Sequence, residues 1–314
     1  MGLAFVFPGQ GSQAVGMGGE LAEAFAASRA VFEEVDDALG QKLSKLMREG
    51  PIEELTLTEN AQPALMAVSM AVVRALESEL GVPISKAAFV AGHSLGEYSA
   101  LAAASAITLA DTARLLKLRG QAMQRAAPVG AGAMASLIGP KTDVALAEAA
   151  AAAGAEVGVC VVANDNNAGN VVISGDKAAV DRAIEAAKAL GARAISLNVS
   201  APFHCPLMQP AADEMAEALA AATIVAPRTP LVANVTARPV LDPETIRRLL
   251  VEQITGRVRW RESVEWLAGE GGVTRFAEAG AGKVLTGMAK RIAPDADAVA
   301  LNTPADLEAF AKSL

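Results

Sequence analysis

A five-residue turn at 92–96 constrains what this chain can fold into more than any other segment. It reads Gly-His-Ser-Leu-Gly with Ser94 in the middle, follows the apolar run 87–91 and opens the helical stretch 97–104. A G-x-S-x-G turn between a strand and a helix is typical of a nucleophile elbow, because glycines allow a backbone bend that side chains would block. The turn therefore predicts a serine hydroxyl raised above the end of a strand, beside the amides of a helix N-terminus. A serine that only caps the helix is the alternative.

Strand and helix patterns alternate on both sides of this turn, starting with the continuously apolar strand 3–7. Such alternation predicts a parallel sheet with helices on both faces. The pattern changes over residues 129–197, which show the order strand, helix, strand, strand, helix, strand of a ferredoxin-like unit. We therefore predict an α/β fold in which a large catalytic domain, residues 1–128 and 198–314, carries an inserted ferredoxin-like small domain, residues 129–197.

Individual elements follow from periodicity and from helix start signals such as the capping box at Thr108. Between two strands of the small domain we expect a turn-rich loop at 164–169. The expected helices span about 19–39, 62–80, 108–124, 142–153, 177–190, 207–221 and 243–254, with a last one beginning at 303. The other expected strands span about 133–138, 157–163, 170–174, 192–197 and 231–234.

Composition argues against several classes of protein. The 314 residues carry a net charge of −8 and no basic run interleaved with aromatic residues, which argues against nucleic acid as a partner. Two cysteines and two histidines are too few for a disulfide framework or a zinc site. Cys160 and Cys205 are therefore expected as buried small residues, and no metal is expected.

The sequence also bears on compartment and assembly. No stretch approaches the roughly 18 apolar residues of a membrane span, and the N-terminus lacks a basic region followed by a long apolar one, as a signal peptide would have. We expect a soluble cytoplasmic protein with no membrane partner. The sequence is compatible with a monomer.

A serine nucleophile needs a general base, and histidine is the usual one. The chain has only His93 and His204. His93 adjoins Ser94 on a sharp turn, where neighbouring side chains diverge, so it is expected to pack at the elbow. His204 lies in the loop 200–206 between two prolines, which stiffen the backbone. By elimination His204 is the predicted base, with a structural histidine as the alternative.

The residues leave open which group would orient the imidazole. The order serine, carboxylate, histidine seen in hydrolase triads would admit Asp165, Asp176 or Asp181. All three fall in the predicted small domain, which is an awkward origin for them. A backbone carbonyl is the other option.

The loop after the first strand, residues 7–13, is a second candidate site. Its glycines allow close approach of a ligand, and one of its amides together with that of Leu95 could form an oxyanion hole. The competing interpretation is a dinucleotide-binding fingerprint, since Gly9, Gly11 and Ala14 fit G-x-G-x-x-A with an acidic residue about 20 positions later.

Arg119 is the third candidate, because it stands among apolar residues of the expected helix 108–124. Such an arginine either extends its charge to solvent or pairs with a buried anion. Periodicity alone favours extension to solvent.

Several segments together resemble the acyl-carrier-protein S-malonyltransferase family, also called malonyl-CoA:acyl-carrier-protein transacylases. They occur in the family's order over nearly the whole chain, so the set is far more specific than any single motif. The segments are 7–13, 92–98, 118–123, 130–134, 170–175, 200–204 and 282–288. The resemblance implies an α/β-hydrolase-like large domain with a ferredoxin-like insert. Departures are small: Gly256 and Arg257 stand where Ser-Pro is common, and Ala281 stands where proline is common.

The resemblance also implies roles for individual residues. Ser94 would be the nucleophile that becomes malonylated, and His204 would be its base. The amides of Gln10 and Leu95 would form the oxyanion hole. The backbone carbonyl of Gln253 would orient the histidine, which would explain why no aspartate of a triad is evident.

Two further roles concern the substrate. Arg119 would pair with the free malonyl carboxylate, contrary to the indication from periodicity. Phe203, just before the base, would crowd a methyl group on the malonyl α-carbon and so favour malonyl over methylmalonyl.

The implied activity is a ping-pong transfer of malonyl from malonyl-CoA to the phosphopantetheine thiol of holo acyl carrier protein. It would supply extender units for fatty-acid or polyketide synthesis, with a coenzyme A thioester as substrate and no cofactor bound to the enzyme. Acyl carrier protein is acidic as a class, so docking needs a local cationic face. The candidates for that face are Arg257, Arg259, Arg261, Lys283, Lys290 and Arg291. A serine hydrolase of similar geometry and a non-catalytic carrier-binding scaffold are the alternatives.

Overall fold

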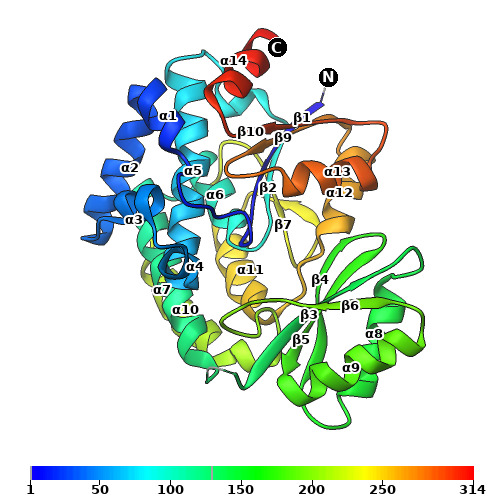
Figure 1. Cartoon of the computed structure of the whole chain (residues 1–314). Helices are drawn as coiled ribbons and strands as arrows, with labels where there is room; N and C mark the ends of the chain where they lie inside the picture. Colours follow the sequence, from blue (N-terminus) through cyan, green and yellow to red (C-terminus); the bar gives the residue numbers. More distant parts are fainter. Residues whose placement is uncertain (1, 129) are drawn as a thin grey trace.

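Two β-sheets organise the chain in the computed structural model, which describes residues 2–128 and 130–314 (Figure 1). The larger sheet has the strand order β10-β9-β1-β2-β7-β8, and all its neighbouring pairs are parallel except β7 with β8. Its strands are β1 (Gly2–Phe7), β2 (Phe89–Gly92), β7 (Leu231–Ala233), β8 (Arg238–Val240), β9 (Val273–Ala279) and β10 (Asp297–Leu301).

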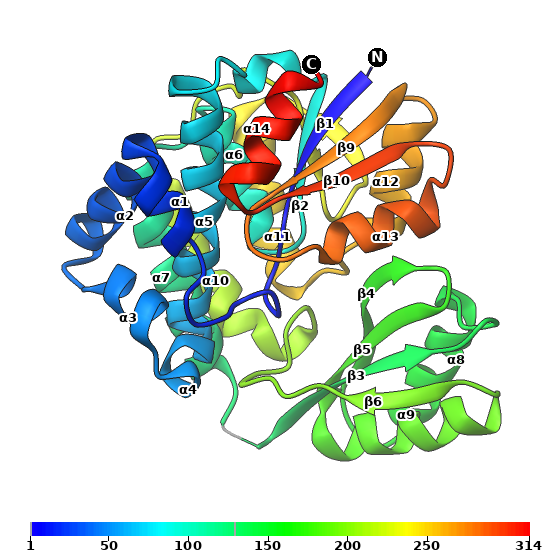
Figure 2. The ribbon, with the colours of Figure 1, turned by 45° about the horizontal axis from the view of Figure 1, so that its top comes forward.

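Helices cover both faces of the larger sheet (Figure 2). Along β1, Phe5 and Phe7 enter one hydrophobic cluster, whereas Ala4 and Val6 enter the other. The cluster on the first face draws residues from ten helices, some of which pack on other helices rather than on the strands. They are α1 (Gly19–Ala24), α2 (Ala26–Leu39), α3 (Leu43–Glu49), α4 (Ile52–Thr56), α5 (Thr58–Ser78), α6 (Gly96–Ala103), α7 (Leu109–Ala126), α10 (Gln209–Ala221), α11 (Pro243–Thr255) and α14 (Pro304–Lys312). The second face packs on α12 (Trp260–Ala268) and α13 (Val284–Ile292). The central parallel strands β1, β2 and β7 consist of apolar residues and glycine, as expected for strands covered on both faces.

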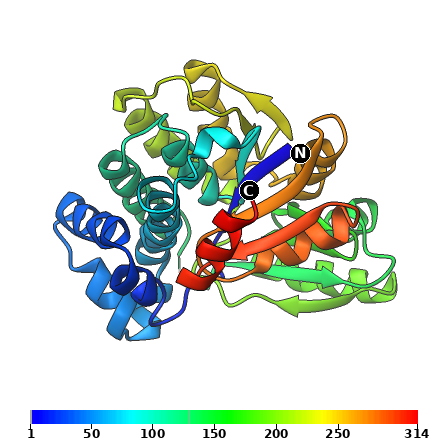
Figure 3. The same cartoon turned by 90° about the horizontal axis from the view of Figure 1, so that it is seen from above.

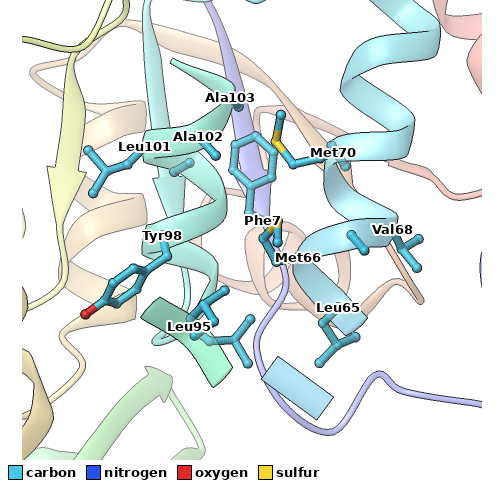
Figure 4. Packing of buried hydrophobic residues seen from close by; sticks show 14 of the residues in the cluster. Phe7, Leu65, Met66, Val68, Met70, Leu95, Tyr98, Leu101, Ala102 and Ala103 are labelled. Atoms are coloured by element: carbon cyan, nitrogen blue, oxygen red, sulfur yellow. The ribbon is translucent and has the colours of Figure 1, made fainter. Parts of the chain in front are cut away.

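The interior of the first face is aliphatic and close-packed. Figure 4 shows Phe7 among Met66 and Met70 of α5 and Ala103 of α6, all of which are buried. The carboxyl end of β1, which leads into the predicted ligand loop, is thereby fixed between two helices.

The smaller sheet is antiparallel, with the order β4-β5-β3-β6. Its elements are β3 (Gly132–Ile138), α8 (Val144–Gly154), β4 (Cys160–Asn167), β5 (Asn170–Asp176), α9 (Lys177–Ala189) and β6 (Arg193–Ser196). This is the predicted βαββαβ order, so the fold class expected from the sequence is confirmed. The exact boundaries at 128/129 and 197/198 stay a prediction, and residue 129 lies outside the described residues.

Strand β4 attaches the smaller sheet to the larger domain. The amide of Asp165 donates to the carbonyl of Val258 at 2.9 Å, and the amide of Val258 donates to the carbonyl of Ala163 at 2.8 Å. The Arg261 guanidinium then pairs with the buried Asp165 carboxylate at 2.8 Å. The smaller sheet is therefore fixed against the segment that leads into α12, in addition to its two chain connections.

Several expected elements differ from the structure. The expected helix 19–39 is two helices, because Phe25 has extended backbone angles. Helix α5 begins at Thr58 rather than at about 62, and it contains Pro63 within its second turn. The elements α3, α4, α12, α13, β8, β9 and β10 had no counterpart in the sequence prediction.

The expected loop 164–169 is the clearest error. Strand β4 continues to Asn167, which leaves only two residues for the turn into β5. Four consecutive polar residues in a strand contradict the usual turn preference of Asn and Asp. All four are buried, and two of them have partners in the larger domain: Asp165 pairs with Arg261, and Asn166 Oδ1 lies 2.9 Å from His93 Nε2.

Figure 3 shows that the two chain termini lie close together on one side of the molecule. None of the helices in the described ranges combines the length and hydropathy that crossing a membrane requires.

The turn 92–96 is too crowded for any additional carbon. A Cβ on Gly96 would overlap the Phe7 carbonyl, and a Cβ on Gly92 would overlap the backbone of Gly96. The strand β1, the turn and the first residues of α6 are thus in backbone contact.

We expect Gly96→Ala to lower the free energy of unfolding by about 1–3 kcal/mol or more, because rigid backbone atoms cannot make room. Gly19→Ala is the matched control, since its added carbon meets no atom within 4 Å and the backbone there is helical. Urea unfolding followed by circular dichroism measures both. Equal unfolding midpoints for the two variants would contradict the crowding.

Candidate active site

Ser94 occupies the turn between β2 and α6 with a positive φ of 52°. Asn234, which directly follows β7, holds this strained turn from the neighbouring strand. Its Oδ1 accepts from the Ser94 amide at 2.8 Å, and its Nδ2 donates to the Gly92 carbonyl at 2.7 Å. The sequence prediction missed Asn234. A polar residue at the carboxyl end of a strand next to the elbow strand is the signal that could have identified it.

His204 meets the serine from the opposite direction. Its Nε2 lies 2.8 Å from Ser94 Oγ, and its Nδ1 lies 2.8 Å from the carbonyl oxygen of Gln253. Since a carbonyl only accepts, Nδ1 carries the proton and Nε2 is free to accept from the hydroxyl. The loop is tightened further by Cys205 Sγ, which donates to the Pro202 carbonyl at 3.1 Å.

The imidazole of His204 is kept neutral. Burial, and next the positive charge of Arg119, lower its pKa to about 3, against the opposing hydrogen bond to Gln253. A neutral imidazole with a free Nε2 is the form that a general base requires.

None of the three aspartates considered from the sequence contacts His204. Asp165 pairs with Arg261, Asp176 accepts from the Val159 amide and Asp181 pairs with Lys177. The group at Nδ1 is the Gln253 carbonyl, so the triad interpretation with an aspartate is wrong for this chain.

Arg119 does not extend to solvent, so the interpretation from periodicity is wrong. Arg119 is only 2% exposed and lies on the buried face of α7. One guanidinium nitrogen donates to Gln62 Oε1 at 2.7 Å, and the other donates to Gln253 Oε1 at 2.8 Å and to Ser94 Oγ at 3.2 Å. Its Nε has no hydrogen-bond partner among the described residues. All partners are neutral oxygens, so the site holds a cation beside the serine hydroxyl without an anion in direct contact.

A chain of side chains joins Arg119 to the loop after β1. Gln62 Nε2 donates to Thr58 Oγ1 at 3.0 Å, and Thr58 Oγ1 donates to Gln10 Oε1 at 3.1 Å. Gln62 and Thr58 were not predicted, because nothing in a helical pattern distinguishes a buried glutamine that binds an arginine from one at the surface.

Gln10 and Leu95 both line the cavity that contains Ser94. Within the ranges 2–128 and 130–314, neither backbone amide donates to a protein acceptor. Free backbone N–H groups near a nucleophile are what an oxyanion hole requires.

The cavity has a volume of about 300 Å³ and lies between the two sheets. The larger domain contributes Ser94, Arg119 and the loop after β1, whereas the smaller sheet contributes apolar side chains and two asparagines. Phe203 also lines it. The lining residues from the smaller sheet and its exit are Met134, Asn164, Asn166, Val172, Leu197, Asn198 and Val199.

His93 packs at the elbow, as expected from the sequence. Its Nε2 lies 2.9 Å from Asn166 Oδ1 of β4, and its ring centroid lies 5.7 Å from that of Trp260. This contact links the turn to the smaller sheet.

Comparison with known proteins gives a consistent result. Residues 4–299 match the family model described as acyl transferase domain. The chain is 47% identical over 307 residues, 98% of its length and 97% of the relative's, to the malonyl CoA-acyl carrier protein transacylase of Escherichia coli K12. The chain belongs to the malonyl CoA-acyl carrier protein transacylase family. The resemblance stated from sequence motifs is thus confirmed, and the chain is an acyltransferase.

Solved structures of the family share the fold. The acyl-carrier-protein-S-malonyltransferase of Bartonella henselae superposes with a TM-score of 0.96 at 56% identity, over 100% of this chain and 99% of that one. A malonyl-transacylase in complex with a holo type II PKS acyl-carrier protein also superposes with a TM-score of 0.96, at 43% identity over the whole of both chains.

The dinucleotide interpretation of the loop after β1 is wrong. In that fingerprint the glycines open a helix directly, so that the pyrophosphate meets its N-terminus. Here α1 begins only at Gly19, and residues 8–18 between β1 and α1 form turns and irregular backbone. Among the described residues, no group of three or more His, Cys, Asp or Glu side chains is placed to hold a metal ion.

We expect the His204 ring to stay neutral down to about pH 5, because burial and the positive charge of Arg119 lower its pKa to about 3. Burial also lowers the pKa of His93. Protein labelled with ¹⁵N-histidine gives two ring systems, and His204→Ala assigns them. The His204 ring should show the tautomer protonated at Nδ1, and Arg119→Ala should raise its pKa by removing a nearby positive charge. A His204 titration near pH 6.5, or a proton on Nε2, would contradict the arrangement.

Proposed function

We propose that this chain transfers the malonyl group of malonyl-CoA to the phosphopantetheine thiol of holo acyl carrier protein through a malonyl-Ser94 intermediate. The observation that carries the proposal is the buried Arg119 guanidinium, 3.2 Å from Ser94 Oγ. A buried cation next to a nucleophile suits an acyl group that carries a carboxylate. The names of the relatives support the same substrate and acceptor.

In the first half-reaction, Ser94 Oγ attacks the thioester carbonyl while His204 Nε2 takes the hydroxyl proton. The amides of Gln10 and Leu95 are the proposed donors to the oxyanion, where loss of one donor typically costs about 10²–10³ in rate. The intermediate then expels the coenzyme A thiolate, which takes the proton from His204. The products are malonyl-Ser94 and free coenzyme A.

In the second half-reaction, the thiol of acyl carrier protein gives its proton to His204 and attacks the malonyl-serine ester. The same amides receive the oxyanion, and Ser94 leaves with the proton from His204. Each proton and acyl group is accounted for by the chain and its two thiol substrates, so the scheme requires no resident cofactor. The product would serve fatty-acid or polyketide synthesis.

Arg119 is the proposed determinant of the acyl group. Its fork of N–H donors can bind a carboxylate through two charge-assisted hydrogen bonds. An acetyl group would leave these donors without an anion, and sites of this kind reject such analogues by up to about 10⁴–10⁵. Phe203 on the cavity wall is proposed to crowd a methyl branch on the malonyl α-carbon.

Intact-protein mass spectrometry after brief mixing with malonyl-CoA tests the scheme. We expect one malonyl adduct, absent in Ser94→Ala and discharged by holo acyl carrier protein. Arg119→Ala should lower kcat/KM for malonyl-CoA about thirtyfold or more, because the carboxylate would remain buried without its partner. Arg125→Ala is the matched control, since that arginine of the same helix is exposed and pairs with Glu214. Steady release of coenzyme A without an adduct would indicate a hydrolase instead.

The structure divides the six basic residues considered for carrier docking. Arg257, Arg259 and Arg261 are engaged in ion pairs, with Glu148 of α8, Glu262 of α12 and Asp165 of β4, respectively. In contrast, Lys283, Lys290 and Arg291 are exposed and belong to no ion pair within the described chain.

We propose the α13 group, Lys283, Lys290 and Arg291, as the docking face for the acidic carrier. Val284, Leu285 and Met288 of the same helix line the cavity, so a carrier bound there would hold its prosthetic arm at the entrance. Because the helix beside these basic residues contributes to the cavity lining, they are favoured over other exposed lysines.

The double variant Lys283→Glu/Lys290→Glu should raise KM for acyl carrier protein about tenfold without slowing formation of malonyl-Ser94, because two attractions become repulsions. Lys86→Glu is the control, since Lys86 is exposed but precedes the amino end of β2, whereas Ser94 follows its carboxyl end. Steady-state kinetics with the carrier as varied substrate gives both values. An unchanged KM for acyl carrier protein in the double variant would refute the proposed docking face.

A further inference from the structure

Glu97 is a buried acid that the reaction scheme does not use. It lies in the first turn of α6, three residues after Ser94, and is 1% exposed. Its Oε2 accepts from Gln253 Nε2 at 2.8 Å and from the Asn234 amide at 3.1 Å. Burial raises its pKa to about 7, although these hydrogen bonds oppose the shift. Burying a carboxyl group costs free energy, so its presence at this position indicates a role in the site.

Both partners of Glu97 hold parts of the active site. Asn234 holds the turn around Ser94 through its side chain. Gln253 contacts three further groups of the site. Its Oε1 accepts from Arg119, and its Nε2 also donates to the Ser94 carbonyl at 3.0 Å. Its backbone carbonyl accepts from His204 Nδ1. Glu97 therefore contacts the two residues that connect the nucleophile, base and guanidinium.

The orientation of the Gln253 amide decides what Arg119 meets. With Nε2 toward Glu97, the amide presents its oxygen to the guanidinium, and every contact joins a donor to an acceptor. The opposite orientation would place an NH₂ group against the guanidinium, which has donors only, and an oxygen against the Glu97 acceptor. The acceptor oxygen of Glu97 thus excludes that orientation.

We propose that Glu97 is a positioning residue which, by fixing the Gln253 amide, holds Arg119 in the pose that recognises a carboxylate on the acyl group. The inference rests on the proposed function, because it concerns selectivity for malonyl over acetyl donors. The role requires an acceptor oxygen at one place rather than a negative charge.

Three variants distinguish the effect of the Glu97 acceptor oxygen from the effect of its negative charge. Glu97→Gln keeps an acceptor at the same reach without charge, Glu97→Asp keeps the charge but withdraws the oxygen by one methylene, and Glu97→Leu removes both. Asp36→Leu is the matched control for the general effect of losing a buried carboxylate, since Asp36 accepts from the Ser44 amide and hydroxyl away from the cavity. Single-turnover acylation of Ser94 gives kcat/KM for malonyl-CoA and for acetyl-CoA.

We expect the ratio of malonyl to acetyl kcat/KM to fall about ten- to a hundredfold in Glu97→Leu and Glu97→Asp, as expected for misplacing a hydrogen-bonded charged group. Glu97→Gln should retain most of the wild-type ratio, and Asp36→Leu should lower stability but leave the ratio unchanged. If Glu97→Leu does not fold, the comparison of Glu97→Asp with Glu97→Gln carries the test.

Two results would overturn the inference while the proposed function stands. One is a wild-type ratio in Glu97→Asp and Glu97→Leu, and the other is an equal loss in Glu97→Gln. Failure of the wild-type enzyme to acquire a malonyl group would instead refute the proposed function.

Discussion

The site depends on one buried cation without an ion-pair partner in direct contact. Removing the Arg119 guanidinium from water is costly, and only neutral oxygens of Gln62, Gln253 and Ser94 compensate for it here. This arrangement leaves most of its positive charge unneutralised beside the serine. The same charge contributes to the low pKa of His204. The Arg119 guanidinium therefore both favours a carboxylate in the cavity and helps to keep the general base neutral.

The second constraint is geometric, since two sheets must meet at one turn. The larger sheet brings the carboxyl ends of β1, β2 and β7 together, which is where ligands bind in open parallel sheets. The smaller sheet closes the cavity from the other side through β4, whose Asn166 reaches His93. The polar residues of β4 therefore form part of the contact between the smaller sheet and the larger domain.

Sequence patterns predicted the fold class and identified Ser94 and His204 as candidates. The strand-turn-helix signal around Ser94 lies within one short segment, and the chain has only two histidines to choose between. They failed where a role depends on distant partners. Arg119 is buried by glutamines 57 and 134 positions away, which no helical period reveals. Asn234 and Glu97 were missed for the same reason. The strands β9 and β10 were also missed, and their places in the sheet come from pairing, of β9 with β1 and of β10 with β9.

The two cysteines have a consequence for a protein proposed to pass an acyl group between thiols. Cys205 lies next to the base and donates its thiol proton to the Pro202 carbonyl, while burial raises the pKa of both sulfurs, that of Cys160 to about 11. Disulfide exchange requires a thiolate that can be approached. Burial and a raised pKa thus disfavour mixed disulfides between either cysteine and coenzyme A or the carrier arm.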